Sequence, residues 1–284
     1  MRFLLSIALF FAALGAAHAQ DTLYFSAIPD EDETRLTERF SAVADYLSEQ
    51  LDIPVEFVPV KSYPAAVTAF RNNQVQLAWF GGLSGVQARL LVPGASAIAQ
   101  GQEDTGFVTY FIANAATGLA ESETFPEAAK GMTFTFGAKT STSGRLMPEY
   151  HIREKTGQAP EDFFGRVGFS GDHSQTLRLV ASGAWQIGAL NFAVYDQAVA
   201  DGAPEVETAK VIWKTPPYPD YNWTIRGDVD ERWGEGFADK VQAALIGMND
   251  PDLLAAFPRK AFIPASNDDY TPIENIARQL DLLE

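Results

Sequence analysis

Short apolar runs alternate with amphipathic segments along most of the chain. Within residues 33–51, for example, Leu36, Phe40, Val43 and Leu47 recur every three or four positions and share one helical face. The predicted strands of the first half are 23–28, 55–60, 75–80, 96–100 and 106–115, and the predicted helices between them are 33–51, 62–73 and 81–91. This alternation is typical of an α/β fold.

The same alternation starts again near residue 132. The second series of strands is 132–137, 166–170, 185–190 and 209–213, with helices at 145–155, 174–183 and 192–202, and the tail has mostly helical patterns, at 237–248, 252–257 and 273–283. The tail cannot build a third domain alone, so we expect it to pack on the first unit. We therefore predict two α/β lobes, formed by 20–112 plus 215–284 and by 113–214. Chain crossings near 110–115 and 215–223 would form a two-strand hinge beside a ligand cleft.

The first 19 residues have a different character. One basic residue, Arg2, precedes an apolar run from Phe3 to Ala17, and the "AHA" of residues 17–19 fits the small-x-small cleavage pattern. The run is short for a membrane span, which needs about 20 residues. We therefore favour a cleavable signal peptide over a membrane anchor, and we expect the mature chain in the periplasm.

The charge of the chain limits its partners. Residues 1–19 hold only Arg2 of the 21 basic residues and none of the 37 acidic ones, so the formal charge changes from −16 for the whole chain to −17 for the mature one. Such an excess disfavours nucleic acid and anionic membranes as partners, but a few local donors could still hold a small anion. With no cysteine and two histidines after residue 19, the chain has few metal ligands, and we predict neither a metal nor a cofactor.

One strand end is unusually rich in hydroxyl groups. The stretch "KTSTSGRLMPEY", from Lys139 to Tyr150, follows a predicted strand and leads into a predicted helix. A single hydroxyl can cap a helix, yet Ser141, Thr142 and Ser143 stand together, and Gly144 lets another backbone approach closely. Free amides and hydroxyls at the carboxyl end of a strand suit a tetrahedral oxyanion. A Ser/Thr-rich turn with one capping residue is the alternative.

Other strand ends carry further candidates. His173 precedes the helix 174–183 and could donate to an oxyanion, which would favour the charged imidazole. The alternative is a surface turn in which Asp172 or Ser174 caps the helix. Asn191 follows the strand 185–190 and could either cap the next helix or bind the ligand.

The first lobe supplies candidates that would face these residues across the cleft. Tyr63 stands at the start of the helix 62–73 and could donate a hydrogen bond to a ligand. Phe80 and Gly81 stand at the junction between the strand 75–80 and the helix 81–91.

Four stretches resemble, in order and spacing, the periplasmic phosphate, phosphite and phosphonate-binding proteins of ABC importers. They are "SYPAAVTAFRNNQVQLAWFGGLS", "TSTSGRLMPEY", "GFSGDHSQTLRLVASG" and "TPPYPDYNWTIRGD". The "STSGRLMPEY" form is most similar to a branch described as selenate-binding. The resemblance implies a two-lobed type II periplasmic binding protein fold that closes about a hinge. It also implies oxyanion contacts from Ser141, Thr142, Ser143, His173 and Tyr63.

Two positions depart from the family pattern. Arg145 stands where many relatives have an apolar or aromatic residue, and it could either bring a positive charge to the anion or lie on the outer helix face. Asn191 occupies a region where aminophosphonate binders tend to have a carboxylate or tyrosine, which disfavours an amine-bearing ligand. Asp172 is the nearest candidate acceptor but could cap a helix instead. The site would then hold mainly donors, which favours a fully ionised or alkylated oxyanion.

We therefore expect a non-catalytic, monomeric solute receptor. It would bind a small oxyanion of the phosphonate, phosphite, phosphate or selenate type and deliver it to an inner-membrane ABC permease. A sensor subunit with the same fold is an alternative that the sequence does not separate from transport. A secreted hydrolase is less consistent with the chain, because the "KTG" of residues 155–157 is not accompanied by an S-x-x-K motif.

Overall fold

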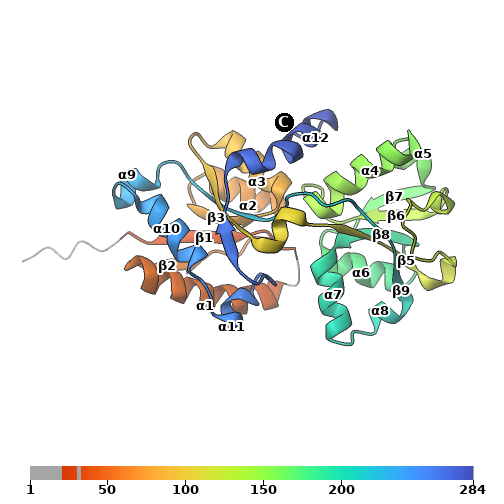
Figure 1. The fold of residues 1–284 in the computed structure, drawn as a ribbon, viewed down its shortest axis with the longest axis horizontal. Helices are drawn as coiled ribbons and strands as arrows, with labels where there is room; N and C mark the ends of the chain where they lie inside the picture. Colours follow the sequence, from red (N-terminus) through yellow and green to blue (C-terminus); the bar gives the residue numbers. More distant parts are fainter. Residues whose placement is uncertain (1–20, 31–32, 284) are drawn as a thin grey trace, which may run out of the picture.

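The protein forms two β-sheets with helices packed around each. The computed structural model describes residues 21–30 and 33–283, and Figure 1 shows the two sheets side by side as two lobes. The predicted signal peptide, residues 1–19, lies outside the described residues.

The first lobe contains a six-stranded sheet in the order β11-β4-β10-β3-β1-β2. Its strands are β1 (Leu23–Ala27), β2 (Val55–Phe57), β3 (Leu77–Phe80), β4 (Ser96–Gly101), β10 (Asn222–Ile225) and β11 (Phe262–Pro264). Its helices are α1 (Glu33–Leu51), α2 (Tyr63–Arg71), α3 (Gly82–Leu91), α9 (Val229–Trp233), α10 (Phe237–Ile246), α11 (Pro251–Leu254) and α12 (Thr271–Gln279). Because β1 is parallel to both β2 and β3, these three strands end at one edge of the sheet.

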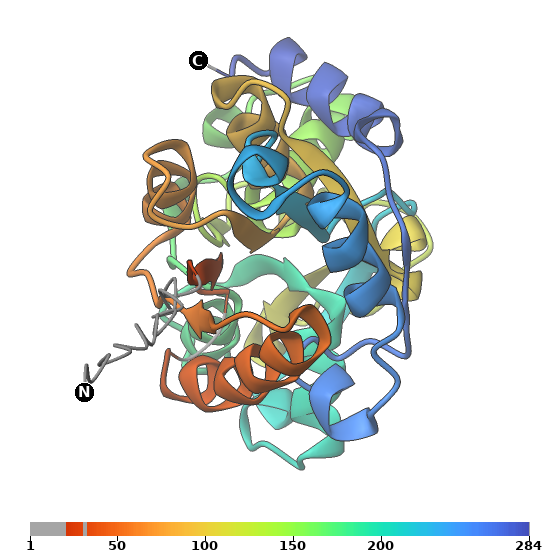
Figure 2. The same cartoon turned by 90° about the vertical axis from the view of Figure 1, so that its left-hand side faces the viewer.

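The tail contributes strands that its sequence pattern does not predict. β10 is antiparallel to both of its neighbours, β3 and β4, and β11 pairs with β4 at the edge. Asn222–Ile225 alternates polar and apolar residues over four positions only, and all four are buried, so the strand is at the lower limit of length for a prediction from alternation. The tail nevertheless packs on the first lobe, where α12 lies beside α3 (Figures 1 and 2).

The second lobe contains a five-stranded sheet in the order β7-β6-β8-β5-β9. Its strands are β5 (Thr109–Asn114), β6 (Thr133–Phe136), β7 (Arg166–Phe169), β8 (Ile187–Asn191) and β9 (Ala209–Lys214). Its helices are α4 (Met147–Thr156), α5 (Pro160–Phe163), α6 (His173–Ala181), α7 (Phe192–Ala200) and α8 (Glu205–Thr208). Since β6 is parallel to both β7 and β8, three adjacent strands end at the same edge.

Both faces of the second sheet are covered by apolar side chains. Phe111 packs with Phe134 on one face, whereas its neighbour Ile112 packs with Val180 and Leu190 on the other. This follows from the two-residue period of a strand, which sends successive side chains to opposite faces. The resulting double-sided core holds the ends of β6, β7 and β8 in fixed positions.

Two hydrogen-bonded segments connect the lobes. Phe107 and Tyr218 exchange backbone hydrogen bonds of 2.9 Å each, and the amide of Thr215 donates to the carbonyl of Thr109 at 3.1 Å. The whole of β5 belongs to the second sheet, so the first crossing precedes Thr109 and lies earlier than the predicted 110–115. The return crossing follows β9 and reaches β10 at Asn222.

A buried ion pair anchors the first crossing. The guanidinium of Arg259, in the tail, donates two hydrogen bonds of 2.7 Å to the carboxylate of Asp104. Both side chains are almost completely buried. Removing one partner of such a pair leaves an uncompensated buried charge, so the tail and the hinge are bound tightly together.

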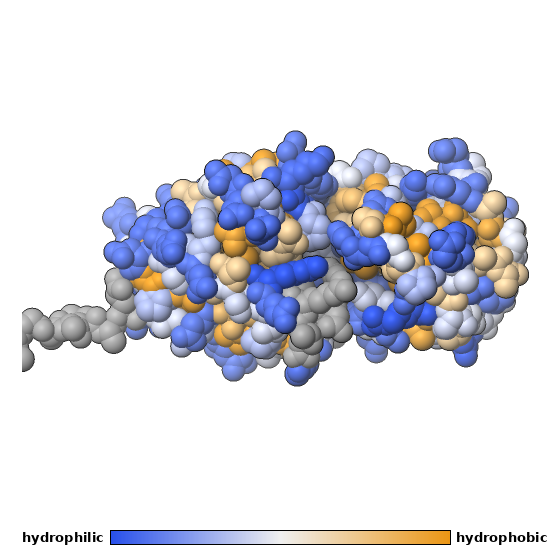
Figure 3. All heavy atoms as spheres, turned by 90° about the horizontal axis from the view of Figure 1, so that it is seen from below, coloured by the Kyte–Doolittle hydropathy of each residue, from blue (hydrophilic) through white to orange (hydrophobic). Residues whose placement is uncertain are grey.

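The outer surface mixes residue types on both lobes. On the face drawn in Figure 3, hydrophilic residues are interspersed with smaller groups of hydrophobic ones. Within the described part of the chain, no helix combines the length and apolar character needed to cross a bilayer.

Candidate functional site

Three predicted site segments meet at the edge where β6, β7 and β8 end. Ser141, Thr142 and Ser143 follow β6, His173 follows β7, and Asn191 is the last residue of β8. All five side chains are buried. The order β7-β6-β8 makes the three strands neighbours, so parallel pairing brings the three turns together.

The helix after β6 begins with a widened turn. Thr142–Leu146 is π-helical, and Ser141 caps it by accepting a 2.9 Å hydrogen bond from the amide of Gly144. The carbonyl of Gly144 accepts from the amide of Gly137 at 2.7 Å, which ties the turn to the end of β6. The amides of Thr142 and Ser143 belong to the first turn and have no acceptor within the helix. They and the Ser141 hydroxyl hydrogen are the donors this turn can offer to an anion.

His173 is positioned as a neutral donor. Its Nδ1 accepts a 3.3 Å hydrogen bond from the amide of Asn191, so the ring hydrogen is on Nε2, which lies 3.4 Å from Ser143 Oγ. Burial lowers the pKa of His173 to about 3, because desolvation disfavours the charged imidazole. The charged form considered from the sequence would require a bound anion to offset this desolvation.

Tyr63 faces this edge from the first lobe. It is the first residue of α2, whose start is capped by Ser62 accepting from the amide of Ala65 at 3.2 Å. Its hydroxyl is buried and has no hydrogen-bond partner among the described residues. Burial and then Asp30 raise the pKa of Tyr63, while the hydroxyl of Ser141 lies near enough to lower it. Tyr63 is therefore a neutral, unused donor beside the capping serine.

The start of α3 touches the second lobe directly. The amide of Leu83 donates a 2.9 Å hydrogen bond to Thr142 Oγ1 across the cleft. A Cβ at Gly81 would lie 3.2 Å from Thr142 Oγ1, so glycine permits this approach. Phe80, by contrast, is a core residue packed edge-on against Phe70 with ring centroids 5.7 Å apart. Its side chain does not join the site, which corrects the prediction for that residue.

Asp220 is a site residue that the sequence reasoning missed. Its Oδ1 accepts a 2.8 Å hydrogen bond from the amide of Gly82, and its Oδ2 is buried without a partner among the described residues. Burial raises the pKa of Asp220 to about 7, against the lowering effect of the Gly82 amide. The residue stands within the "TPPYPDYNWTIRGD" stretch, but a lone aspartate in a turn carries no local signal of burial. Asp172, the acceptor considered from sequence, instead caps α6 by accepting from the amide of Gln175 at 2.6 Å.

Arg145 and Asn191 have other contacts. The guanidinium of Arg145 pairs with Glu149 and stacks 4.4 Å above the ring of Phe136, so of the two roles considered from the sequence it does not bring its charge to the anion site. Asn191 caps α7 and donates from Nδ2 to the hydroxyl of Tyr221 at 3.3 Å. It therefore orients His173 through its backbone and joins the lobes through its side chain.

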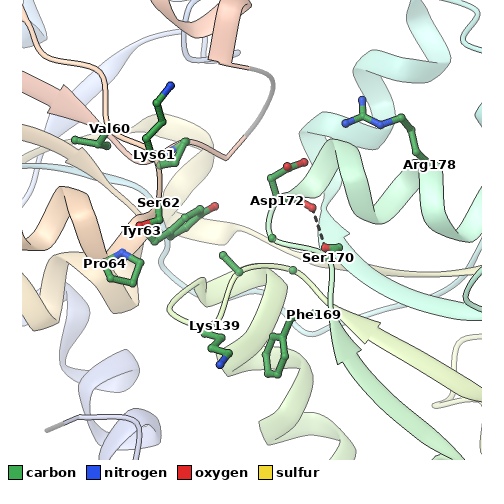
Figure 4. A pocket seen from close by; sticks show the side chains of 14 residues that line it. Val60, Lys61, Ser62, Tyr63, Pro64, Lys139, Phe169, Ser170, Asp172 and Arg178 are labelled. Atoms are coloured by element: carbon green, nitrogen blue, oxygen red, sulfur yellow. Dashed lines mark hydrogen bonds between the residues drawn. The ribbon is translucent and has the colours of Figure 1, made fainter.

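A cleft of about 550 Å³ lies between the lobes outside these buried donors. Figure 4 shows Lys61, Ser62 and Tyr63 on its first-lobe side and Phe169, Ser170 and Asp172 on its second-lobe side. Lys139 and Arg178 line it as well. A ligand could approach the donors through this opening if the lobes separate.

The fold and the site together define a class of protein. Two α/β lobes joined by two crossings place neutral hydroxyl, amide and imidazole donors on facing strand ends, which is the architecture of a hinged solute-binding protein.

Comparisons with known proteins identify the family. A family model described as "ABC transporter, phosphonate, periplasmic substrate-binding protein" matches residues 25–270. The chain is 38% identical to the probable ABC transporter phosphite-binding protein PhnD1 of Prochlorococcus marinus, over 98% of this chain and 97% of that protein. The structure of PhnD1 in complex with methylphosphonate superposes with a TM-score of 0.87 and covers 92% of this chain and 98% of the other.

A more distant relative is the phosphonates-binding periplasmic protein of Escherichia coli, which is 26% identical over 72% of this chain and 62% of its own length. The chain therefore belongs to the periplasmic substrate-binding proteins of phosphonate ABC transporters, and its role is to bind a substrate for such a transporter.

Proposed function

We propose that this protein captures a small phosphonate or phosphite anion between its lobes and delivers it to an inner-membrane permease. It would act as a monomer without turning the ligand over, after export through the signal peptide of residues 1–19. One lobe would comprise 20–107 and 216–284, and the other 109–214. The observation that carries the proposal is the buried, unused hydroxyl of Tyr63, which faces the donor-rich turn at Ser141 from the opposite lobe.

The donors suit an oxyanion for a simple reason. Tyr63, Ser141 and His173 are neutral, so the ligand would keep its negative charge while exchanging its water for protein hydrogen bonds. Donors from both lobes would contact one anion only in the closed state. The ligand would therefore bind that state more tightly and shift the population toward it.

Asp220 favours a ligand that can carry a proton. Selenate and sulfate are fully ionised near neutral pH, so beside them Asp220 would have to stay fully protonated, whereas its pKa of about 7 leaves it partly ionised at that pH. A phosphonate or phosphite monoanion could instead donate its hydroxyl hydrogen to Oδ2, which has no protein partner among the described residues. We therefore rank these ligands above selenate, against the similarity of the "STSGRLMPEY" stretch to a selenate-binding branch.

Isothermal calorimetry with methylphosphonate, phosphite, phosphate, sulfate and selenate tests the proposal. We expect phosphite or methylphosphonate to bind with a Kd of about 1 μM or tighter and to remain chemically intact. Replacing Ser141→Ala and Thr142→Val together should raise that Kd by about 100-fold. The first change removes a hydrogen bond to a charged group, which contributes about 1.5–3 kcal/mol, and the second removes the contact of Thr142 Oγ1 with the Leu83 amide, which joins the lobes.

The control removes a hydroxyl elsewhere in the same lobe. Thr135 is buried in β6, and its Oγ1 donates to the carbonyl of Phe136 at 2.9 Å, so Thr135→Val should leave the Kd nearly unchanged. Absence of binding to every anion in the series, or an unchanged Kd in the double variant, would remove the proposed role of this site.

A further inference from the structure

A chain of buried side chains connects the hinge to the anion-binding turn. Thr109 Oγ1 lies 2.9 Å from the carbonyl oxygen of Ser143 and 2.5 Å from the hydroxyl of Tyr218. Thr109 begins β5 and Tyr218 belongs to the return crossing, so the two residues stand on different hinge segments. Ser143 lies in the widened first turn. All three are buried.

The direction of these hydrogen bonds follows from their chemistry. A carbonyl only accepts, so the Thr109 hydroxyl must donate to Ser143. Thr109 has a single hydroxyl hydrogen, and the short contact with Tyr218 must therefore be donated by the tyrosine. Burial raises the pKa of Tyr218 well above its usual value, which keeps its hydroxyl protonated for this purpose. Tyr218 therefore donates to Thr109, and Thr109 donates to the carbonyl of Ser143.

This series acts on the peptide group that links Ser143 to Gly144. The π-helical turn diverts two successive carbonyls away from the helix, that of Ser143 to Thr109 and that of Gly144 to Gly137. The orientation of each peptide plane also sets the direction of its amide, because the peptide unit is planar. The hinge therefore fixes the orientation of the Ser143–Gly144 peptide plane, which lies next to the amides of Thr142 and Ser143 that are free to bind an anion.

We infer that Thr109 and Tyr218 are positioning residues for the anion site. They touch no ligand but hold the turn at Ser143 in its binding geometry when the hinge is in the closed arrangement. The inference rests on the proposed oxyanion-binding function, and it adds that affinity depends on a hinge hydroxyl outside the cleft.

The test compares two threonines of the same hinge. Thr109→Val removes the link to Ser143, and we expect the Kd for methylphosphonate to rise about tenfold, or 1.4 kcal/mol, whereas Thr109→Ser should retain most of the affinity. Thr215→Val is the matched control, since Thr215 Oγ1 accepts a 2.9 Å hydrogen bond from the Thr109 amide but makes no contact with Ser143 in the described hydrogen bonds. It should change the Kd less than about twofold.

Amide hydrogen exchange provides a readout that needs no ligand. Exchange at Gly144 and its neighbours in the turn should accelerate in Thr109→Val and not in Thr215→Val. Equal effects of the two valine variants on Kd and exchange would overturn the inference in favour of general hinge destabilisation, as would an unchanged Kd with unchanged exchange in Thr109→Val. If the unaltered protein binds no oxyanion, the proposed function fails, while the exchange comparison still decides whether the hinge positions the turn.

Discussion

At the scale of single residues, burial decides the protonation of the candidate site. The imidazole of His173 is neutral because it is fully desolvated, and the same cause raises the pKa of Asp220 to about 7, so that its carboxyl is only partly ionised at neutral pH. Burial thus shifts the pKa of both residues toward their uncharged forms. The histidine is an uncharged donor, and the partly ionised aspartate can either accept or donate a hydrogen bond.

The raised pKa of Asp220 predicts a particular dependence of stability on pH. Its pKa is about 7 in the fold, against an ordinary value of 3.8 for an aspartate, so between these two pH values the unfolded chain releases the proton while the folded protein retains it. The retained proton of Asp220 therefore contributes fully to the free energy of unfolding below about pH 4. That contribution is lost as the pH rises to about 7, by up to about 1.4 kcal/mol per pH unit.

Urea unfolding from pH 4 to pH 8 measures this effect. The wild-type free energy of unfolding should fall relative to that of Asp220→Asn across this range, since asparagine does not titrate and the other groups are shared. Parallel curves for the two proteins would show that Asp220 ionises normally.

At the scale of elements, close packing shapes the anion-binding turn. A Cβ on Gly144 would lie 3.0 Å from Ser141 Oγ, 3.1 Å from the Cα of Gly137 and 3.2 Å from Cε1 of His173. The glycine thus allows the turn, the end of β6 and the imidazole to come together. Helical periodicity in the sequence does not reveal the π-helical geometry, because the same residues could continue an ordinary α-helix.

Gly144→Ala should therefore damage binding more than folding. We expect the added methyl group to displace the capping serine or His173 and to raise the Kd for methylphosphonate by about tenfold, with a small change in Tm. Gly106→Ala is the control, because the nearest atom to its new Cβ, on Pro217, is 4.0 Å away. Equal affinity of the Gly144→Ala variant and the wild type would mean that the turn adjusts without cost.

At the scale of the whole molecule, hydrogen bonds join the two lobes around the site. The amide of His173 donates to the carbonyl of Asp30 at 3.1 Å. Tyr221, in the first lobe, donates to the carboxylate of Asp30 at 2.8 Å and accepts from Asn191 of the second lobe. These contacts and the one between Leu83 and Thr142 all join the lobes directly, so we expect them to stabilise a closed arrangement relative to an open one.

Tyr221→Phe should reduce the closed population. Because only the closed state is competent to bind, its apparent Kd should rise by about fivefold, equivalent to roughly 1 kcal/mol for the lost hydrogen bonds. X-ray scattering should show a larger radius of gyration without ligand and a normal one at saturating methylphosphonate. Tyr46→Phe removes a hydroxyl whose hydrogen bond among the described residues is to the carbonyl of Ala244, within the first lobe, and should leave both measurements unchanged.

The α/β elements, the strand ends that carry Ser141 and His173, and the helix start at Tyr63 can all be predicted from the amino-acid sequence. This is possible because periodicity and capping are local, and parallel strands bring their carboxyl ends to one edge. Only the folded structure shows that β10 inserts between β3 and β4, that Asp220 is buried and that His173 is neutral. Each of these depends on contacts between residues far apart in the chain, and desolvation and pairing at such contacts leave no mark on the neighbouring sequence.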